Sequence, residues 1–390
     1  MSLAATAHGM SKMRVKPDWA PLGLEEVRAL LQQYEGCGEP VEMVSVSPRP
    51  FSAASVVRTC DRSVFIKRHH HSVRDREGAL EEHRFLTHLH ENGGAVSRVL
   101  ETGAGETAIE LGAWTYEVHA CGGGVDIYAD ALSWTPFFSA AHAHSAGSML
   151  ARLHQAAEGF HAPPRKARPL VASFSIFAEE NAALGMERYL GERPALAGDA
   201  LTRHCCDEAL DLLTPFHGRL KPHLSALQPL WTHNDLHASN LLWRGEEAET
   251  IIDFGLADRS NAMHDLAHAI ERNIVEWLEL DADSARIDNV PVHLDHLNEL
   301  LDGYASQRPL SHAEAQSLAP MTALCHAEFA LTEADYFLGV LRSEENARLC
   351  VEDYLLGHAR WYRGPGGKKL LDAIDRWAEG HLKRRRDEAE

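Results

Sequence analysis

Alternating apolar and polar positions predict short strands in the first third of the chain. A period of two residues is typical of a strand with one buried face. The segments that show it, or share its strand-forming composition, are 41–46, 55–59, 63–66, 107–111 and 114–120. A small sheet is therefore expected before residue 121.

Helical spacing dominates the rest of the chain. Leu80, Phe85, Leu86 and Leu89 lie roughly on one face of a helix between the third and fourth strands. The run Cys121-Gly-Gly-Gly124 then breaks the strand pattern. Helical segments after it are marked by Ala146, Met149, Leu150 and Leu153, by Leu266, Ile270, Ile274 and Trp277, and by 292–304, 313–341 and 347–362. The expected fold class is α+β, with the sheet first and the helices after it.

Two short motifs carry residues suited to phosphoryl transfer. The first is Trp231-Thr-His-Asn-Asp-Leu-His-Ala-Ser-Asn240, and Asp253 of Ile252-Asp-Phe-Gly255 follows thirteen residues after Asn240. Phosphoryl transfer needs positioning and charge neutralisation rather than covalent work by the protein. Asp235 is suited to orient a hydroxyl and take its proton, while Asn240 and Asp253 offer oxygen ligands for Mg²⁺. A predicted hairpin with a polar turn at 244–250 would bring these two ligands together.

Each motif alone has an ordinary interpretation. A single His-x-Asp is common, and Asp253-Phe-Gly255 could be a strand-to-turn exit in which Gly255 supplies a positive φ. The joint pattern, with its hairpin context, favours the catalytic interpretation of Asp235, Asn240 and Asp253.

The first motif resembles a known family. His233-Asn-Asp-Leu-His-Ala-Ser-Asn240 is similar to the H-G-D-L-H-P-G-N loop of aminoglycoside phosphotransferases. Their relatives include choline, homoserine and methylthioribose kinases and a stress-response Ser/Thr kinase. His237 and Asp265-Leu-Ala267 match this branch rather than eukaryotic protein kinases. Ala238 and Ser239 replace the usual Pro and Gly, but both are small enough to keep the turn.

The resemblance implies a bilobal, protein-kinase-like fold. Residues 1–120 would form a nucleotide-binding lobe with an antiparallel sheet and one main helix, and residues 1–20 would be a flexible start. Residues 121–390 would form a mostly helical lobe with the catalytic loop and the acceptor pocket.

The resemblance also assigns the residues that would bind ATP. Lys67, at the end of the third strand, would contact the α- and β-phosphates. Glu82 on the next helix would pair with Lys67, with Glu81 as its competitor.

The phosphates would be covered by the loop 47–55, which has no G-x-G-x-x-G sequence. Its backbone N–H groups and the hydroxyls of Ser52 and Ser55 are the candidate contacts. Backbone groups from Glu117 to His119 would hold the adenine.

The remaining assignments concern the catalytic loop and the acceptor. His233 is expected to support the loop through hydrogen bonds, and Asp265 to brace it from the following helix. Candidate acceptor contacts, each more often a core or surface residue, are Glu328, Glu333, Asp335, Tyr336 and Phe337.

Composition indicates an ordinary globular enzyme. Apolar residues make up 45% of the 390 positions, which argues against disorder. The net charge of −19 disfavours nucleic acid as a partner, and Lys383-Arg-Arg-Arg386 is interpreted as a solvated helix end. No apolar run approaches the roughly 18 residues of a membrane helix.

Cysteine usage and the first residues bear on the compartment. Seven cysteines without a C-x-x-C pair, and a polar start at 1–16, predict a cytoplasmic protein with reduced thiols. His69-His-His71 is interpreted as an exposed strand end rather than a zinc site, because neighbouring strand residues point in different directions.

The leading hypothesis is an ATP- and Mg²⁺-dependent phosphotransferase that acts on a hydroxyl of a small molecule. Aminoglycosides, amino alcohols, homoserine and sugars are the candidate classes, and an acidic chain is compatible with a cationic acceptor. A monomer or homodimer is expected. The alternatives are a Ser/Thr protein kinase and a nucleotide-binding pseudokinase, although Lys67, Asp235, Asn240 and Asp253 are all intact.

Overall fold

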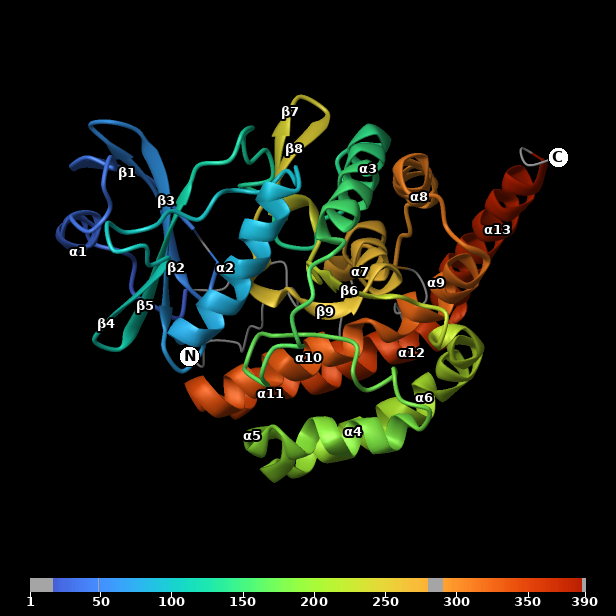
Figure 1. Cartoon of the computed structure of the whole chain (residues 1–390). Coiled ribbons are helices and arrows are strands. Elements are labelled where there is room, and N and C mark those ends of the chain that lie inside the picture. The colour runs from blue at the N-terminus through green and yellow to red at the C-terminus, as the bar shows by residue number, and fades with distance from the viewer. Residues whose placement is uncertain (1–16, 48, 280–289, 388–390) are drawn as a thin grey trace.

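A five-stranded antiparallel sheet forms the N-terminal part of the protein (Figure 1). The computed structural model describes residues 17–47, 49–279 and 290–387. Every neighbouring pair of strands in the sheet is antiparallel. In spatial order the strands are β1 (Pro40–Val46), β2 (Ala53–Thr59), β3 (Ser63–His70), β5 (Trp114–Ala120) and β4 (Ala108–Leu111).

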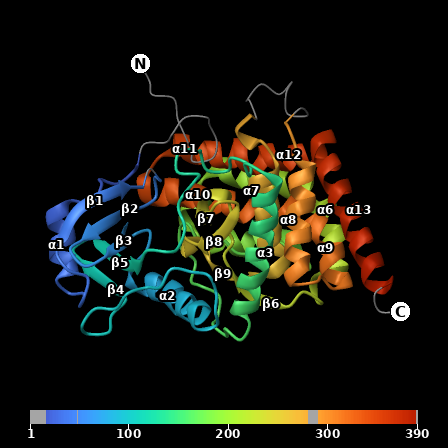
Figure 2. The same ribbon diagram turned by 90° about the horizontal axis from the view of Figure 1, so that it is seen from above.

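The two faces of this sheet have different partners. Val64 and Ile66 of β3 point toward helix α1 (Leu24–Leu31), and together they form a small separate core. Lys67 and His69 alternate with them and therefore point to the other face, where helix α2 (Arg76–Glu91) lies. The Asp75 side chain caps α2 by accepting a hydrogen bond from the backbone N–H of Gly78 at 2.8 Å. This face also borders the helical part of the protein (Figure 2).

The C-terminal part is mostly helical. Its main helices are α3 (Ala140–Ala157), α4 (Ala182–Gly191), α5 (Pro194–Gly198), α6 (Ala200–Leu224), α7 (Ala262–Ile274), α8 (Leu294–Gln307), α9 (His312–Leu324), α10 (His326–Asp335), α11 (Glu344–Leu349), α12 (Gly357–Arg363) and α13 (Pro365–Asp387). Two π-helical segments interrupt the series, η5 (Tyr336–Leu341) and η6 (Cys350–Leu356). The predicted α+β, protein-kinase-like fold class is confirmed.

Two small antiparallel pairs of strands flank the predicted catalytic residues. Strands β6 (Pro229–Thr232) and β9 (Asp258–Asn261) form one pair. Strands β7 (Leu241–Arg244) and β8 (Glu247–Ile251) form the predicted hairpin, with Gly245 at a φ of 62° in its turn. Between these strands lie two short 3₁₀ turns, η1 (Ala238–Asn240) and η2 (Phe254–Leu256).

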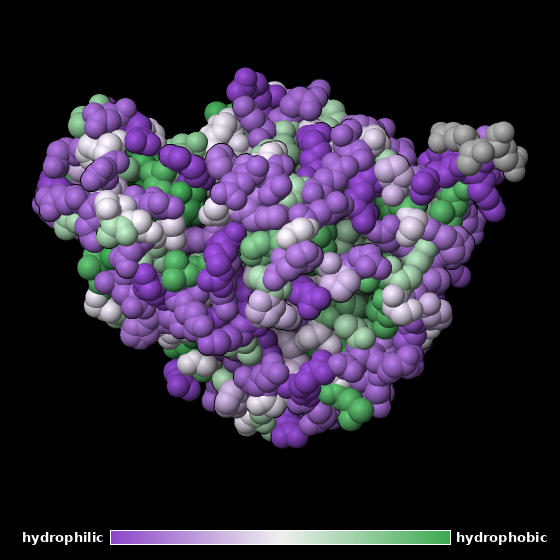
Figure 3. Space-filling model, viewed as in Figure 1, coloured by the Kyte–Doolittle hydropathy of each residue, from purple (hydrophilic) through white to green (hydrophobic). Residues whose placement is uncertain are grey.

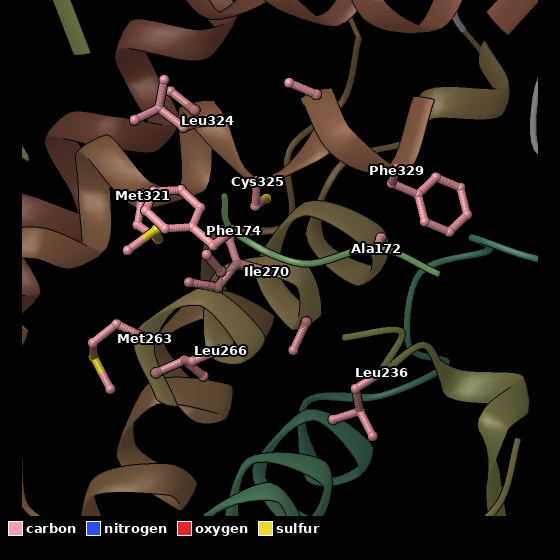
Figure 4. Close-up of a cluster of buried hydrophobic side chains, with 14 of the residues drawn as sticks. Ala172, Phe174, Leu236, Met263, Leu266, Ile270, Met321, Leu324, Cys325 and Phe329 are labelled. Atoms are coloured by element: carbon pink, nitrogen blue, oxygen red, sulfur yellow. The ribbon is translucent and has the colours of Figure 1, made fainter. Parts of the chain in front are cut away.

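The large core fixes the catalytic loop against α7. Leu266 and Ile270 of α7 pack near Met321 and Leu324 of α9, and Leu236 of the loop lies at the edge of the same cluster (Figure 4). Every residue of α7 is buried, because the helix runs through the middle of this part. The loop therefore lies on a rigid support.

The surface agrees with the overall polarity of the sequence. The face shown in Figure 3 is mostly hydrophilic, with separate hydrophobic patches. No helix within the described residues is long and apolar enough to cross a membrane.

The start of the chain differs from expectation. Residues 1–16 lie outside the described residues, but Asp18 and Trp19, within the stretch 1–20 that was expected to be flexible, are half-buried. Trp19 stacks on His70 with ring centroids 5.0 Å apart, and Asp18 accepts a hydrogen bond from the Tyr336 hydroxyl at 2.8 Å. The sequence signal was missed because the partners of these residues come from distant segments.

Candidate active site

The loop that carries Asp235 is anchored by the side chain of Asp265 on α7. The Asp265 carboxylate accepts hydrogen bonds from the backbone N–H groups of His233 (2.9 Å) and Asn234 (2.8 Å). Asn234 has a φ of 62°, a conformation that Asn tolerates better than most residues. His154 of α3 lies 3.0 Å from Asp265 and adds a further contact. The turn before Asp235 is thus fixed from two helices.

His233 connects the catalytic loop to the strand that leads to Asp253. Its Nδ1 accepts a hydrogen bond from the backbone N–H of Asp235 at 3.2 Å, so the proton resides on Nε2. Nε2 then donates to the carbonyl of Ile252 at 2.9 Å. Both ring nitrogens are engaged, which suits a supporting role rather than that of a base.

Asn240 and Asp235 are in direct contact. The Asn240 amide Nδ2 donates to the backbone carbonyl of Asp235 at 2.9 Å and lies 3.2 Å from its Oδ2. The backbone N–H of Ile252 donates to the Asn240 carbonyl at 3.0 Å, which brings Asp253 beside the loop. The hairpin therefore joins the two predicted metal ligands, as its spacing suggested.

The predicted lysine, catalytic carboxylate and two metal ligands line one pocket between the sheet and the helices. Lys67, Asp235, Asn240 and Asp253 line it together. Its remaining walls are Arg49, Phe51, Ser52, His69, Val73, Arg74, Ser133, Trp134, Leu170, His237, Gly255, Leu256 and Phe329. The pocket thus combines charged groups with aromatic and aliphatic side chains.

Lys67 and Asp253 form an ion pair, with 2.7 Å between Nζ and Oδ1. Burial alone would raise the pKa of Asp253, but the Lys67 ammonium outweighs burial and holds this pKa well below its usual range. The same pair keeps the pKa of Lys67 raised in spite of burial. At neutral pH both groups are therefore charged.

Glu82 does not make the predicted pair with Lys67. It forms a buried ion pair with Arg74, a residue of the β3–α2 connection. Arg74 also donates to the carbonyl of Gly255 at 2.7 Å, so it links α2 to the segment after Asp253. Glu81, the competitor, pairs with Arg168 at 2.8 Å. The prediction was wrong because a second cation, closer to α2, was not considered.

The loop that was expected to cover phosphates is shorter than predicted. Strand β2 begins at Ala53, so the loop ends at Ser52, which does line the pocket. Ser55 lies opposite Ile66 in the sheet and shares the face that packs on α1. The proposed phosphate contact of Ser55 is therefore wrong, because strand alternation turns it away from the pocket.

The backbone from Glu117 to His119 is already used by the sheet. Glu117 is paired with Lys67 on one side and with Ala108 on the other. The Val118 carbonyl accepts the N–H of Leu100 at 2.8 Å. The first backbone beyond the strand belongs to Cys121 and Gly122. The adenine contact of residues 117–119 stays a prediction.

Arg272 is a residue of the site that the sequence interpretation missed. It has no exposed surface, and its Nη1 lies 3.1 Å from Oδ1 of Asp235. Its guanidinium is stacked over the rings of Phe329, at 3.9 Å, and Trp134, at 4.8 Å. Burial raises the pKa of Asp235 to about 6, and the charge of Arg272 opposes that rise. Arg272 lies seven residues after Asp265, which is two turns further along the same helix. This spacing was the signal in the sequence that could have identified Arg272.

Arg49 is a second missed residue. From the β1–β2 loop it donates to the hydroxyl of Ser239, beside Asn240, at 2.8 Å and also to that of Ser133. The guanidinium of Arg49 thus connects the β1–β2 loop to the catalytic loop. Nothing in the local sequence marks this contact, because its partners lie far away along the chain.

None of the five candidate acceptor contacts is among the residues that line the pocket. Glu328 accepts hydrogen bonds from the backbone of Ser175 and Ile176 and therefore stabilises a loop. Phe337 packs edge-on against Phe51, with centroids 6.4 Å apart. Glu333 has no exposed surface, Asp335 is buried with a raised pKa caused by desolvation, and Tyr336 contacts Asp18. Trp134 and Phe329 do line the pocket, and their rings stack with Arg272, which contacts Asp235.

Residues 48–290 match the model of the phosphotransferase enzyme family, which is more than half of the chain. No curated protein matches the sequence.

Solved structures of kinases share the fold. The microcompartment-associated aminopropanol kinase has a TM-score of 0.58 at 16% identity, covering 87% of this chain and 98% of that one. Amicoumacin kinase, in complex with AMP-PNP, has a TM-score of 0.56 at 14% identity, covering 86% and 92%. Choline kinase from Cryptosporidium parvum has a TM-score of 0.55 at 12% identity, covering 91% and 99%.

Proposed function

Because this chain belongs to the phosphotransferase enzyme family, we propose that it transfers the γ-phosphate of ATP, with Mg²⁺, to a hydroxyl of a small molecule. The observation that carries the proposal is the single pocket lined by Lys67, Asp235, Asn240 and Asp253. Such a transfer requires a cation for the phosphates, a carboxylate that faces the acceptor hydroxyl, and oxygen ligands for the metal ion.

The two metal ligands fit Mg²⁺ in their donor atoms. Asp253 is ionised at neutral pH, because Lys67 lowers its pKa. Asn240 directs its amide Nδ2 at Asp235, which leaves its Oδ1 as the free amide oxygen. Both donors are oxygens, which Mg²⁺ prefers, and the bound ion would neutralise charge on the phosphates.

Lys67 would bind the phosphates of the nucleotide. Its ammonium is held at Asp253, so phosphate and metal ligand meet at one side of the pocket. Arg49 reaches the residue beside Asn240 from the covering loop. We place it near the transferred phosphoryl group, where a second cation would stabilise negative charge. Backbone groups of Cys121 and Gly122 are the candidate adenine contacts.

Asp235 would orient the acceptor hydroxyl. The hydroxyl oxygen attacks the γ-phosphorus, the bond to the β–γ bridging oxygen breaks, and ADP leaves. The hydroxyl proton passes to the Asp235 carboxylate late in the step, since the transition state is loose. Arg272 would hold that carboxylate in place and favour its ionised form.

The walls around Asp235 indicate a compact acceptor. Phe51, Trp134, Leu170, Leu256 and Phe329 supply aromatic and aliphatic surface to the pocket that contains Asp235. Structural neighbours are named as kinases of aminopropanol and choline. Small amino alcohols are therefore the first acceptor class to examine, followed by homoserine, sugars and aminoglycosides.

A coupled ADP-release assay with this acceptor panel tests the proposal. We expect ATP- and Mg²⁺-dependent turnover with at least one small-molecule acceptor. Turnover only with a general protein substrate would favour the protein-kinase alternative, and no transfer to any acceptor would contradict the proposal.

Removal of the carboxylate tests the assignment of Asp235. In Asp235→Ala we expect kcat to fall about 10²- to 10⁴-fold, while binding of ATP is largely kept. The matched control is Asp207→Ala, which removes an exposed carboxylate on α6 and should retain activity. Near wild-type turnover in Asp235→Ala would exclude Asp235 as the base.

A further inference from the structure

Three histidines converge on one buried carboxylate behind the sheet. His69 Nε2 lies 2.9 Å from Oε1 of Glu117. His83 Nε2 and His119 Nε2 lie 2.6 and 3.2 Å from Oε2 of the same residue. All four side chains are buried, and none has a part in the proposed phosphate transfer. His69 was expected at an exposed strand end, so the structure corrects that prediction.

The four residues come from three different elements. His69 is on β3, His83 on α2, and Glu117 and His119 are on β5. Glu117 and His119 are two residues apart on a strand, so their side chains share one face. The cluster therefore lies between α2 and the sheet, directly beside Lys67, whose sheet partner is Glu117.

The spacing of the donor atoms is close to that of a metal centre. The ligand atoms of His83, Glu117 and His119 all lie within 4.8 Å of one another. His69 is outside this group and contacts the other carboxylate oxygen, Oε1, of Glu117. In a tetrahedral zinc site with bonds of about 2.0–2.1 Å, neighbouring donor atoms are about 3.3 Å apart. The closest observed pair, at 2.6 Å, would open by about 0.7 Å, a shift that rotation of the Glu117 carboxylate can supply.

The chemistry of the donors selects the class of ion. Two imidazole nitrogens and one carboxylate oxygen suit zinc and its neighbours in the transition series, whereas Mg²⁺ and Ca²⁺ prefer oxygen alone. The other ring nitrogen of His83, Nδ1, lies 2.9 Å from the hydroxyl of Thr107. Metal-binding histidines commonly have such an outer partner, which fixes the ring orientation. His69 also lines the pocket, which provides a path for an ion to enter.

We propose that His83, Glu117 and His119 bind one divalent transition-metal ion of the zinc class, while His69 orients the Glu117 carboxylate through its other oxygen. The ion would fasten α2 to β5, the strand that pairs with β3 and places Glu117 opposite Lys67. It is separate from the Mg²⁺ assigned to Asn240 and Asp253, and the inference does not depend on the acceptor.

Metal content and cobalt spectroscopy on the full chain test this proposal. Protein dialysed against a chelator is titrated with Co²⁺, and visible d–d absorption is recorded. We expect one tightly bound ion per chain with the intense bands of a tetrahedral site, and displacement of Co²⁺ by one equivalent of Zn²⁺. Metal analysis of wild type after Zn²⁺ loading and gel filtration should also give one ion. Wild-type protein that binds neither ion stoichiometrically would overturn the proposal and leave a hydrogen-bonded cluster only.

Variants locate the ion. His83→Gln and His119→Gln should each lose the intense bands, and Zn²⁺ should no longer raise their melting temperature as it does for wild type. The matched control is His71→Gln, an exposed histidine at the end of the same strand as His69. His293→Gln tests the second group of donor residues, His293, Asp295 and His296, which is less buried. Bands that persist in both His83→Gln and His119→Gln, or that vanish in His293→Gln, would contradict the assignment.

Discussion

The environment of Asp235 is set by buried charges rather than by solvent. Arg272 has acidic groups on several sides: Asp235 at 3.1 Å, Glu271 at 3.9 Å, and Glu333 as a more distant neighbour. Removing one partner of such a buried pair leaves an uncompensated charge, which costs several kcal/mol. The carboxylate that would meet the acceptor is therefore tied to the stability of the helical core. Substitutions near it have to be interpreted through both activity and folding.

Glu333 gives this arrangement a measurable pH dependence. Burial raises its pKa to about 8 from an ordinary value of 4.5, and Arg272 only partly opposes the rise. Between about pH 4.5 and 8 the folded protein therefore holds a proton that the unfolded chain releases, so stability falls as pH rises through this window. The expected slope is about 1.4 kcal/mol per pH unit within the window.

Glu333→Gln removes that proton equilibrium. We expect urea unfolding at a series of pH values to show a free energy of unfolding that rises in the variant relative to wild type from about pH 4.5 to 8. Above this window the difference should stay constant. Glu187→Gln, at an exposed position of α4, serves as control and should run parallel to wild type. If the stability of Glu333→Gln also ran parallel to that of wild type across this pH range, Glu333 would ionise normally in the folded protein.

At the scale of elements, the crossing of α3 and α8 supports the catalytic hairpin. A Cβ on Gly147 would lie 2.0 Å from the backbone carbonyl oxygen of Leu300, and one on Gly303 would lie 2.1 Å from that of His144. The helices therefore touch through their backbones. Ser145 of α3 also accepts the N–H of Ala248 in β8 at 2.8 Å. Because α3 also holds the hairpin, a movement of α3 away from α8 would displace the hairpin that positions Asp253.

Gly147→Ala should therefore destabilise the protein by about 3 kcal/mol, because the overlap with backbone exceeds the gain in helix propensity. Thermal or urea unfolding measures the change. Gly218→Ala in α6 is the matched control: its added Cβ meets no atom within 4 Å, so it should stabilise by up to about 1 kcal/mol. Equal effects of the two substitutions would mean that α3 and α8 do not pack this closely.

The same scale shows which features a sequence can predict. Strand and helix positions followed from periodicity, and two contiguous motifs placed Asp235, Asn240 and Asp253 in one pocket. Ser55 was misplaced because the strand begins two residues earlier than its pattern suggested. Glu82 lies on the predicted helix, but its partner is decided by Arg74 in a loop. Contacts between distant segments, such as Arg49 with Ser239, leave no local signal.

At the scale of the whole molecule, three distant segments meet beside the pocket. Phe51 of the β1–β2 loop packs edge-on against Tyr336 of η5, with ring centroids 5.1 Å apart. The backbone N–H of Asp18 donates to the carbonyl of Pro50 at 3.2 Å, and its carboxylate accepts from the Tyr336 hydroxyl. We call these contacts among Asp18, Phe51 and Tyr336 the clasp. The clasp holds the β1–β2 loop against the helical part of the protein.

Phe51→Ala should loosen the clasp and let bound nucleotide leave faster. An aromatic pair contributes about 0.5–1.5 kcal/mol beyond its buried area, so we expect dissociation of a fluorescent ATP analogue to accelerate about 2- to 10-fold. Stopped-flow displacement with unlabelled ATP measures the rate. Leu184→Ala, at a side chain on α4 that is 66% exposed, is the control and should leave it unchanged. An unchanged rate in Phe51→Ala would show that the β1–β2 loop closes the pocket without help from η5.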